Sequence, residues 1–253
     1  MSHFTVAVIH NKNQNIEDLL EPYNENLDVE PYINRTKAEM IEQGYRTKQY
    51  VEENKGECIG SWAYKYLKAE TDEDIWQVEK NEICCTYNEN GDEFTTYNPD
   101  SKWDWWEVGG RFNGNIKLRN ENDMYVNSAK IEDIDFSIDE NEYNSHKRWY
   151  EVVVEGSEPQ NEREKEWDTI YSLDDYRDKY SGADDFARRN SKFTTFAVVT
   201  PDGVWHEKGR MGWWGISNET GDESRDWDAN YYDRFIAPYD PKGTYITIVD
   251  CHI

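Results

Sequence analysis

Two short blocks of this chain place tryptophan rings beside glycines and a single arginine. The first block covers residues 103–112 and the second covers residues 209–215. Their candidate ligand-binding residues are Trp103, Trp105, Gly109, Gly110 and Arg111 in the first block, and Arg210, Gly212, Trp213 and Trp214 in the second. Tryptophan offers a large stacking face, arginine offers a planar fork of donors, and glycine lets another group approach the main chain closely. Together these residue types suit a planar anionic ligand such as a nucleotide. The alternative is that the rings fill a core poor in leucine, with the arginines stacked on them or paired with carboxylates.

The two ends of the chain supply a second set of reactive side chains. Residues 4–9 and 244–252 both have the apolar, β-branched character of buried strands. If these strands are antiparallel neighbours, His3 lies near His252, and Asp250 lies close to both. Imidazoles titrate near neutral pH, so this group could transfer protons in an enzyme. The alternative is that the terminal histidines only cap strand edges.

Established catalytic and cofactor motifs are missing from the sequence. It contains no G-x-S-x-G, no G-x-x-x-x-G-K-[ST], no G-x-G-x-x-G after a strand and no H-E-x-x-H. None of the local ligand spacings of zinc proteins is present, so neither a metal nor another cofactor is expected. The 53 acidic side chains are too many for any pair to be singled out as general acid and base. A binding protein is therefore favoured over an enzyme.

The charge of the chain bears on its partners. With 28 basic and 53 acidic side chains, the formal net charge is −25. Phosphate contacts require a positive surface, so direct binding to nucleic acid is not expected. The expected partner is a protein with a basic surface, which an acidic face could occupy by imitating a phosphate backbone. The alternative is a solvated acidic surface that serves solubility.

Composition predicts a globular protein. The hydrophobic fraction is only 36%, but 18 Tyr and 11 Trp can supply a large apolar area. We expect one α+β domain over residues 1–253. No stretch approaches the roughly 18 consecutive apolar residues of a membrane helix, and the start lacks the layout of a signal peptide. A soluble protein without a membrane partner is expected, with Cys58, Cys84, Cys85 and Cys251 as thiols.

Several strands can be placed from turn signals. Residues 83–97 read as a hairpin around an Asn-Gly turn, and residues 193–207 as a second hairpin around Pro-Asp-Gly. The first tryptophan block alternates aromatic residues on both faces, which is typical of a central strand, and Gly109 and Gly110 would end it.

Helices are predicted from capping residues and apolar spacing. Thr36 can cap a helix over residues 37–54, and Thr220 can cap one over residues 222–236. The second helix carries Trp227, Tyr231 and Phe235 at i, i+4 and i+8, so it should lie on the sheet. Further helices are expected over residues 59–68, 72–80, 142–154 and 172–180.

Two regions have weaker patterns. Residues 19–33 contain two prolines and indicate an extended segment, and residues 115–192 indicate an acidic helical insertion. The expected fold class is α+β, with a mostly antiparallel central sheet that contains the first and last strands.

Five sequence motifs together resemble an uncharacterised family of bacteriophage-encoded proteins. The motifs are Met1–Val6, Ser101–Trp105 with Gly109–Arg111, Thr195–Val199, Met211–Gly215 and Asp250–Ile253. Trp106 and Phe112 depart from the pattern, where a smaller aromatic residue and a tryptophan are expected. The resemblance brings no established activity and no catalytic residue.

The resemblance implies an accessory protein that acts on host machinery in the cytoplasm of the host bacterium, most commonly against a defence system. Three functions compete. The first is a non-enzymatic acidic inhibitor of a host protein that handles nucleic acid. The second is a binder or hydrolase of a nucleotide signal, which uses the tryptophan and arginine blocks with His3 and His252. The third is a structural protein of the virion.

Overall fold

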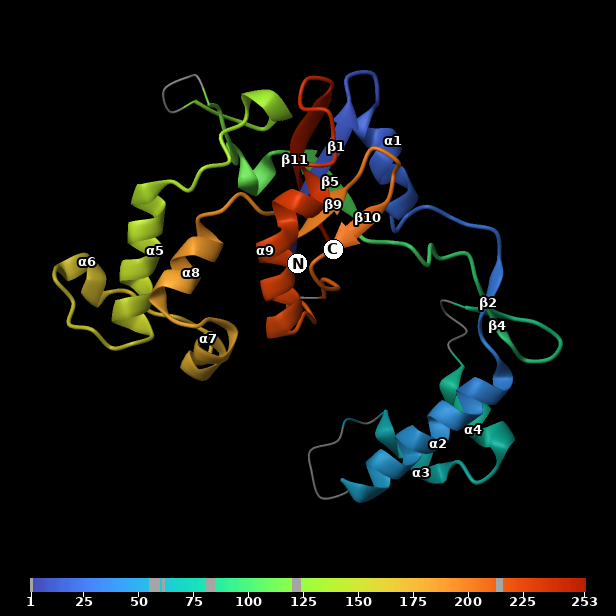
Figure 1. Ribbon diagram of the computed structural model, residues 1–253. Coiled ribbons are helices and arrows are strands. Elements are labelled where there is room, and N and C mark those ends of the chain that lie inside the picture. Colours follow the sequence, from blue (N-terminus) through green and yellow to red (C-terminus); the bar gives the residue numbers. More distant parts are fainter. Residues whose placement is uncertain (1, 55–59, 61, 81–84, 120–123, 213–215) are drawn as a thin grey trace. The chain divides into compact units, whose positions relative to one another are not determined.

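The structure is a computed structural model that describes residues 2–54, 60, 62–80, 85–119, 124–212 and 216–253 (Figure 1). The chain divides into two compact units, where the sequence predicts one domain over residues 1–253. The larger unit combines residues 1–25 with residues 100–253, and the smaller unit is residues 26–99. The larger unit therefore forms from both ends of the chain, which suits a sheet that contains both terminal strands.

The elements of each unit are as follows. The larger unit has strands β1 (His3–Asn11), β5 (Trp105–Val108), β6 (Ile116–Lys117), β7 (Tyr125–Val126), β8 (Ser128–Lys130), β9 (Ala197–Val199), β10 (Trp205–Glu207) and β11 (Thr244–His252). Its helices are α1 (Ile16–Leu20), α5 (Glu140–Val153), α6 (Glu162–Lys165), α7 (Leu173–Lys179), α8 (Ala183–Asn190) and α9 (Gly221–Phe235), with 3-10 turns η1 (Glu21–Tyr23), η2 (Gly110–Phe112) and η3 (Ile131–Asp133). The smaller unit has β2 (Tyr32–Arg35), β3 (Thr86–Tyr87), β4 (Glu93–Thr95), α2 (Lys37–Glu53), α3 (Ala63–Lys68) and α4 (Asp72–Glu79).

The main sheet confirms the predicted α+β class. Its order is β10-β9-β1-β11-β5, with β8 also paired to β11. Only the β1–β9 pair is parallel, and β1 and β11 are antiparallel neighbours over their full length. Both are long strands of β-branched and apolar residues, and they are buried on both faces of the sheet.

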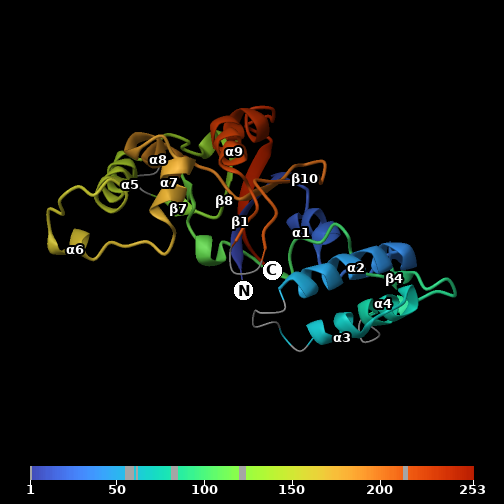
Figure 2. The same ribbon diagram turned by 90° about the horizontal axis from the view of Figure 1, so that it is seen from below.

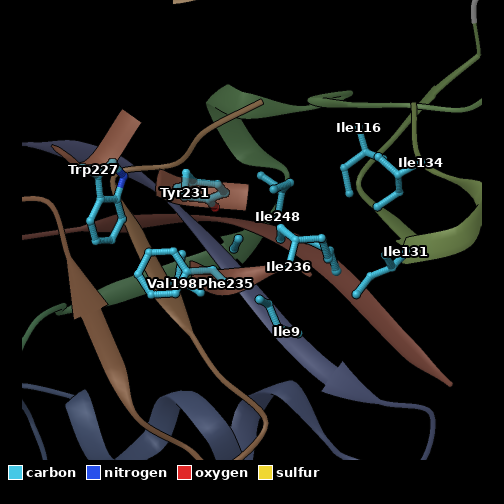
Figure 3. Close-up of a cluster of buried hydrophobic side chains, with 12 residues drawn as sticks. Ile9, Ile116, Ile131, Ile134, Val198, Trp227, Tyr231, Phe235, Ile236 and Ile248 are labelled. Atoms are coloured by element: carbon cyan, nitrogen blue, oxygen red, sulfur yellow. The ribbon is translucent and has the colours of Figure 1, made fainter. Parts of the chain in front are cut away.

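Each face of this sheet has its own core. On one face α9 packs its rings Trp227, Tyr231 and Phe235 against Ile9 and Ile248 of the central strands (Figure 3). On the other face Phe4, Val6, Val8, Val249 and Cys251 pack with Leu20 and Trp103. The helix begins at Thr220, whose side chain and that of Glu223 form a capping box. The prediction that this helix lies on the sheet is confirmed.

The helices α5, α7 and α8 form a cluster of their own (Figure 2). Tyr150, Tyr176, Tyr180 and Phe186 make ring contacts within it. In the described part of the chain, no helix is long and apolar enough to cross a lipid bilayer.

Two predictions about helical and extended segments need correction. Residues 116–119 and 124–134 are not a helical insertion, because β8 pairs with β11 and Ile116, Ile131 and Ile134 enter the core under α9. The helical part of that region begins only at Glu140. An extended segment is predicted over residues 19–33, but its start lies in α1 and η1, because Asn15 caps a helical turn and η1 tolerates a proline in its first turn.

The tryptophan block also differs from its prediction. It forms β5, which pairs with β11 alone and ends the main path of the sheet. It is therefore an edge strand, and Trp105 and Val108 are 46% and 45% exposed. Gly109 and Gly110 do end the strand, with φ angles of +76° and +50° that glycine adopts without strain.

The smaller unit matches its predicted elements closely. Thr36 and Glu39 form a capping box at the start of α2, and β3 and β4 form a hairpin within the described residues. The part of the predicted hairpin at residues 83–84, and the part of the predicted helix at residues 59 and 61, lie outside the described residues.

Candidate functional site

The candidate site is assembled by the register of β1 and β11. His3 pairs directly with His252, and Thr5 pairs with Asp250. Side chains of directly paired residues lie on the same face of a sheet, and diagonal neighbours are also within reach of long side chains. His3, Asp250 and His252 therefore project together from the face that carries α9. The predicted proximity of these three residues is confirmed.

The first imidazole is held by a buried carboxylate. His3 Nδ1 lies 2.9 Å from Asp250 Oδ1 and 3.1 Å from Oδ2. The Asp250 side chain is only 1% exposed, and its Oδ2 also accepts a hydrogen bond of 2.9 Å from the backbone N–H of Arg111. A buried carboxylate needs such partners, since an unpaired charge in the interior costs several kcal/mol.

The second imidazole has its own carboxylate. His252 Nδ1 lies 2.5 Å from Asp104 Oδ1, and the backbone N–H of Asp104 donates to the carbonyl of His252. Asp104 directly precedes β5, so the pairing of Trp105 with His252 places Asp104 beside the His252 ring. The sequence reasoning did not single out Asp104. No local signal could have done so, because the β5–β11 pairing joins segments far apart in the chain.

The two imidazoles lie side by side and reach solvent. Their ring centroids are 5.0 Å apart, with an angle of 70° between the planes. The His3 and His252 side chains are 17% and 12% exposed, so each has an accessible edge. The Trp105 ring meets His3 edge-on at 6.4 Å and is itself half exposed.

The contacts with the two carboxylates determine which nitrogen of each imidazole can exchange a proton with a substrate. An ionised carboxylate only accepts hydrogen bonds, so Nδ1 of each imidazole carries a proton toward its Asp partner. The atom left to give or take a proton is Nε2, as in the oriented histidines of hydrolases. Two such imidazoles can act as a general base and a general acid on one substrate, each contributing roughly 10²–10⁴-fold.

Gly110 allows the main chain to approach Asp250. A Cβ at this position would lie 2.5 Å from Asp250 Oδ2 and from its Cβ. The absence of a side chain therefore lets the Arg111 N–H reach the carboxylate. Gly109 donates its N–H to the carbonyl of Ile248, so it fixes the same turn to β11. Both glycines support the site through the backbone.

The second tryptophan block is partly brought to this end of the sheet. The Ser2 hydroxyl, next to His3, donates to the carbonyl of Gly212 at 2.9 Å. Arg210 is exposed, and its backbone N–H donates to Asn218 Oδ1, so only its main chain is tied to this turn. Trp213 and Trp214 lie outside the described residues.

The tryptophans of the first block have different roles. Trp103 is 5% exposed, belongs to the core opposite α9, and donates its indole N–H to the carbonyl of Leu20. It was predicted as a ligand contact, with a core position as the alternative, and its burial places it in the core. Trp105 remains a candidate for contact with a ligand. Arg111 does too, because it is exposed and makes no ion pair within the described part of the chain.

Cys251 points away from the site. It lies between Asp250 and His252 on β11, so its side chain enters the opposite core. Burial, followed by the nearby charge of Asp250, raises the pKa of this thiol well above its ordinary value. The thiol is therefore protonated and packed. Cys85 is partly buried, and Cys58 and Cys84 lie outside the described residues.

Among the described residues, no three His, Cys, Asp or Glu side chains are grouped in a way that could hold a metal ion. His3 instead pairs with Asp250, and His252 pairs with Asp104.

The chain was compared with known proteins. No family model, no curated protein and no solved structure matches it.

Proposed function

We propose that this chain binds a nucleotide and performs acid–base chemistry on its phosphate at the His3–His252 site. The observation that carries the proposal is the pair of imidazoles 5.0 Å apart, each with Nδ1 on its own carboxylate. A structural role would be complete with one hydrogen bond per ring, whereas this arrangement orients two partly exposed imidazoles side by side, with no hydrogen bond to either Nε2 among the described residues. Phosphate chemistry suits the pair, because it needs one proton removed and one supplied.

The neighbouring side chains support a nucleotide as the ligand. Trp105 provides an exposed ring on which a base can stack, and such stacking contributes about 1–3 kcal/mol. Arg111, whose backbone N–H donates to Asp250, has an exposed side chain that can pair with a phosphate. A stacking ring, a phosphate donor and two proton carriers are the parts that such a site requires.

The setting of this activity is part of the proposal. Following the resemblance to phage-encoded proteins, we propose that the chain acts in the cytoplasm of the host bacterium, where it removes a nucleotide signal of a defence system. No cofactor is needed for the proton transfers described.

The acidic-inhibitor hypothesis is placed second. Its basis is the net charge, and acidic residues are in excess throughout the chain. Residues 26–99 hold 16 acidic and 8 basic side chains, and residues 139–190 hold 15 and 8. The excess is thus shared between segments rather than concentrated in one, as a solvated surface requires. The virion hypothesis gains no support from any feature of the fold.

The test uses the purified full chain with a panel of ribonucleotides, followed by melting shifts and by chromatography of the products. His3→Asn and His252→Asn are the informative variants, because Asn keeps a donor at the Nδ1 position and removes Nε2. We expect each to lower turnover by at least about 100-fold while the melting temperature stays within a few degrees.

His10→Gln is the matched control. His10 lies on the same strand as His3 but on the opposite face, where its Nε2 contacts Thr247 Oγ1 at 2.9 Å. Turnover should survive this change. If no nucleotide is turned over or shifts the melting temperature, and a basic host protein is retained until high salt, the inhibitor hypothesis replaces this one.

A further inference from the structure

The chemistry of the site points to a particular class of substrate. We infer that the substrate is a short or cyclic ribonucleotide whose own hydroxyl, vicinal to the phosphodiester, is the nucleophile. This inference rests on the proposed function and specifies its reaction.

The first step of the argument concerns what the site supplies. His3 and His252 are both oriented through Nδ1, so together they can remove one proton and deliver another. Proton transfers contribute roughly 10²–10⁴-fold each. Well-oriented intramolecular reactions reach effective molarities of about 10⁵–10⁸ M. A site built from two proton carriers therefore gains most from a substrate that brings its own nucleophile.

The second step is the balance of the reaction. One imidazole takes the proton of the vicinal hydroxyl through Nε2, and the hydroxyl oxygen forms a bond to phosphorus. The bond from phosphorus to the 5′ oxygen of the next nucleoside breaks, and that oxygen receives a proton from Nε2 of the other imidazole. The products are a cyclic phosphate and an alcohol, and no water, metal or oxidant is consumed.

The third step concerns the placement of the two proton carriers. Displacement at phosphorus puts the attacking and leaving oxygens on opposite sides of the phosphorus atom. Two imidazoles with centroids 5.0 Å apart on one sheet face can each reach one of these oxygens. Asp250 and Asp104 hold the rings from different strands, so each ring keeps its orientation independently of the other.

The fourth step limits the length of the substrate. A chain with a net charge of −25 repels a long polyanion, since its field opposes every additional phosphate. The exposed side chains of Arg111 and Trp105 serve one phosphate and one base. Dinucleotides and cyclic dinucleotides fit this limit, and long RNA does not.

The experiment compares matched pairs of probes with the full chain. The probes are ApA, GpG, UpU and CpC, together with 3′,3′-cyclic di-AMP and 3′,3′-cyclic di-GMP, each beside its 2′-deoxy form. Reactions run in water enriched in oxygen-18, and mass spectrometry identifies the first product. A doubly substituted chain with His3→Asn and His252→Asn, purified identically, controls for contaminating ribonuclease.

We expect cleavage of a ribonucleotide probe to a 2′,3′-cyclic phosphate without oxygen-18, no cleavage of its 2′-deoxy form, and a loss of at least about 100-fold in the double variant. Equal cleavage of the deoxy form, or oxygen-18 in the first product, overturns the inference but leaves the proposed function standing, with water as the nucleophile. A melting shift without any turnover also overturns the inference and reduces the function to binding. If no probe is cleaved or shifts the melting temperature, the proposed function fails as well.

Discussion

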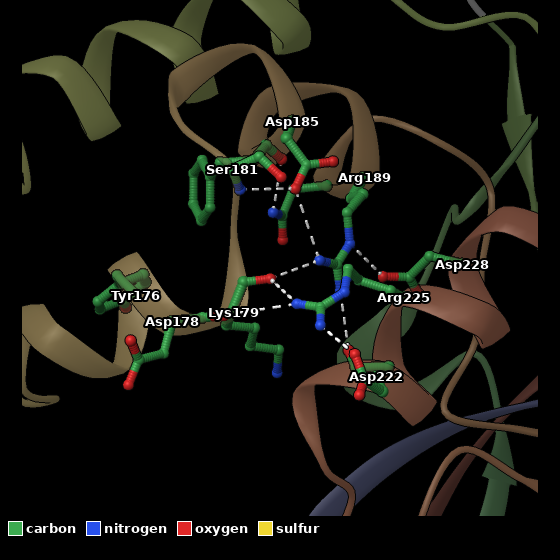
Figure 4. A network of polar contacts seen from close by, with 12 residues as sticks. Tyr176, Asp178, Lys179, Ser181, Asp185, Arg189, Asp222, Arg225 and Asp228 are labelled. Carbon is green, nitrogen blue, oxygen red and sulfur yellow. Dashed lines mark hydrogen bonds and ion pairs between the residues drawn. The ribbon is translucent and has the colours of Figure 1, made fainter.

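In the larger unit, the Arg189–Asp228 network and the His3–Asp250 pair are both buried, but they differ in how many of their nitrogen and oxygen atoms have hydrogen-bond partners. Around Arg189, Nε donates to Asp228, Nη1 to the carbonyl of Lys179, and Nη2 to the hydroxyl of Ser224 (Figure 4). The second oxygen of Asp228 accepts from Lys208 at 2.9 Å. This network joins α8 to α9, and each guanidinium nitrogen of Arg189 and both oxygens of Asp228 have a hydrogen-bond partner in the protein.

The His3–Asp250 pair is buried in a different way. Asp250 is as enclosed as Asp228, with side chains 1% and 6% exposed, yet the imidazole that it holds is 17% exposed. The comparison teaches that burial of a charge does not by itself mark a functional group. What distinguishes the candidate site is that each imidazole is oriented through Nδ1, while the described residues provide no hydrogen bond to its Nε2.

The largest expected effect is a loss of stability when the Arg189 network is broken. Arg189→Met leaves Asp228 buried with a single cation, so we expect a loss of about 3–5 kcal/mol in the free energy of unfolding, measured by urea denaturation. Lys165→Met is the control, because Lys165 and its partner Glu162 are 57% and 89% exposed. It should cost below about 1 kcal/mol. Equal stability of the two variants would mean that the Arg189 network contributes no more than a surface pair.

The second prediction separates two neighbouring tryptophans. Trp103→Ala should destabilise the chain by about 3–5 kcal/mol, since it empties a core position and leaves the carbonyl of Leu20 without its donor. Trp105→Ala should leave the free energy of unfolding within about 1 kcal/mol and weaken nucleotide affinity by about 10-fold or more. Calorimetric titration and urea denaturation measure the two quantities. A reversal of the pattern would place the ligand away from β5.

The third prediction tests how closely the main chain must approach Asp250. Gly110→Ala adds a Cβ against that carboxylate at a φ of +50°, and should cost about 1–3 kcal/mol and also lower turnover. Gly156→Ala is the matched control, because Gly156 has a φ of +76° but open space around its Cβ. It should cost about 1 kcal/mol and leave turnover unchanged. If Gly110→Ala retains full turnover, the Arg111 contact is not needed to hold the site.

Much of the fold could be predicted because its signals are local. The capping boxes at Thr36 and Thr220 mark helix starts within four residues, and the turn at residues 201–203 fixes the β9–β10 register. The proximity of His3 and His252 could also be predicted, because both terminal segments have the character of central strands.

The rest depends on contacts between distant segments. Nothing near residues 116–134 indicates that three isoleucines enter the core under α9, because the strands there have only two or three residues. Alternating aromatics on β5 suggested a central strand, but the same alternation fits an edge strand with one ring exposed at a site. Asp104 could not be chosen among 53 acidic residues until the β5–β11 register placed it beside His252.

The smallest expected effect concerns a saturated carboxylate in the smaller unit. Glu93 is 1% exposed and accepts hydrogen bonds from Arg35, Asn34 and Tyr87. The Arg35 guanidinium holds the pKa of this carboxyl below its ordinary value, with Asn34 and Tyr87 acting in the same direction. A carboxyl with a lower pKa in the folded state contributes stability that is complete above its unfolded pKa of about 4.3 and is lost as pH falls.

We therefore expect amide exchange of residues 26–99 to accelerate, beyond its intrinsic pH dependence, as pH is lowered from 6 toward 3. Hydrogen exchange with mass spectrometry isolates this unit from the sheet. Glu93→Gln removes the titrating group, so its corrected opening free energy should be lower at pH 6 and less dependent on pH. Parallel curves for the two chains would show that the Glu93 network does not link protons to folding. Asp250 also accepts hydrogen bonds on both oxygens, but one of its donors is the partly exposed imidazole of His3, and that difference makes Glu93 a structural carboxylate and Asp250 a positioning group for the candidate site.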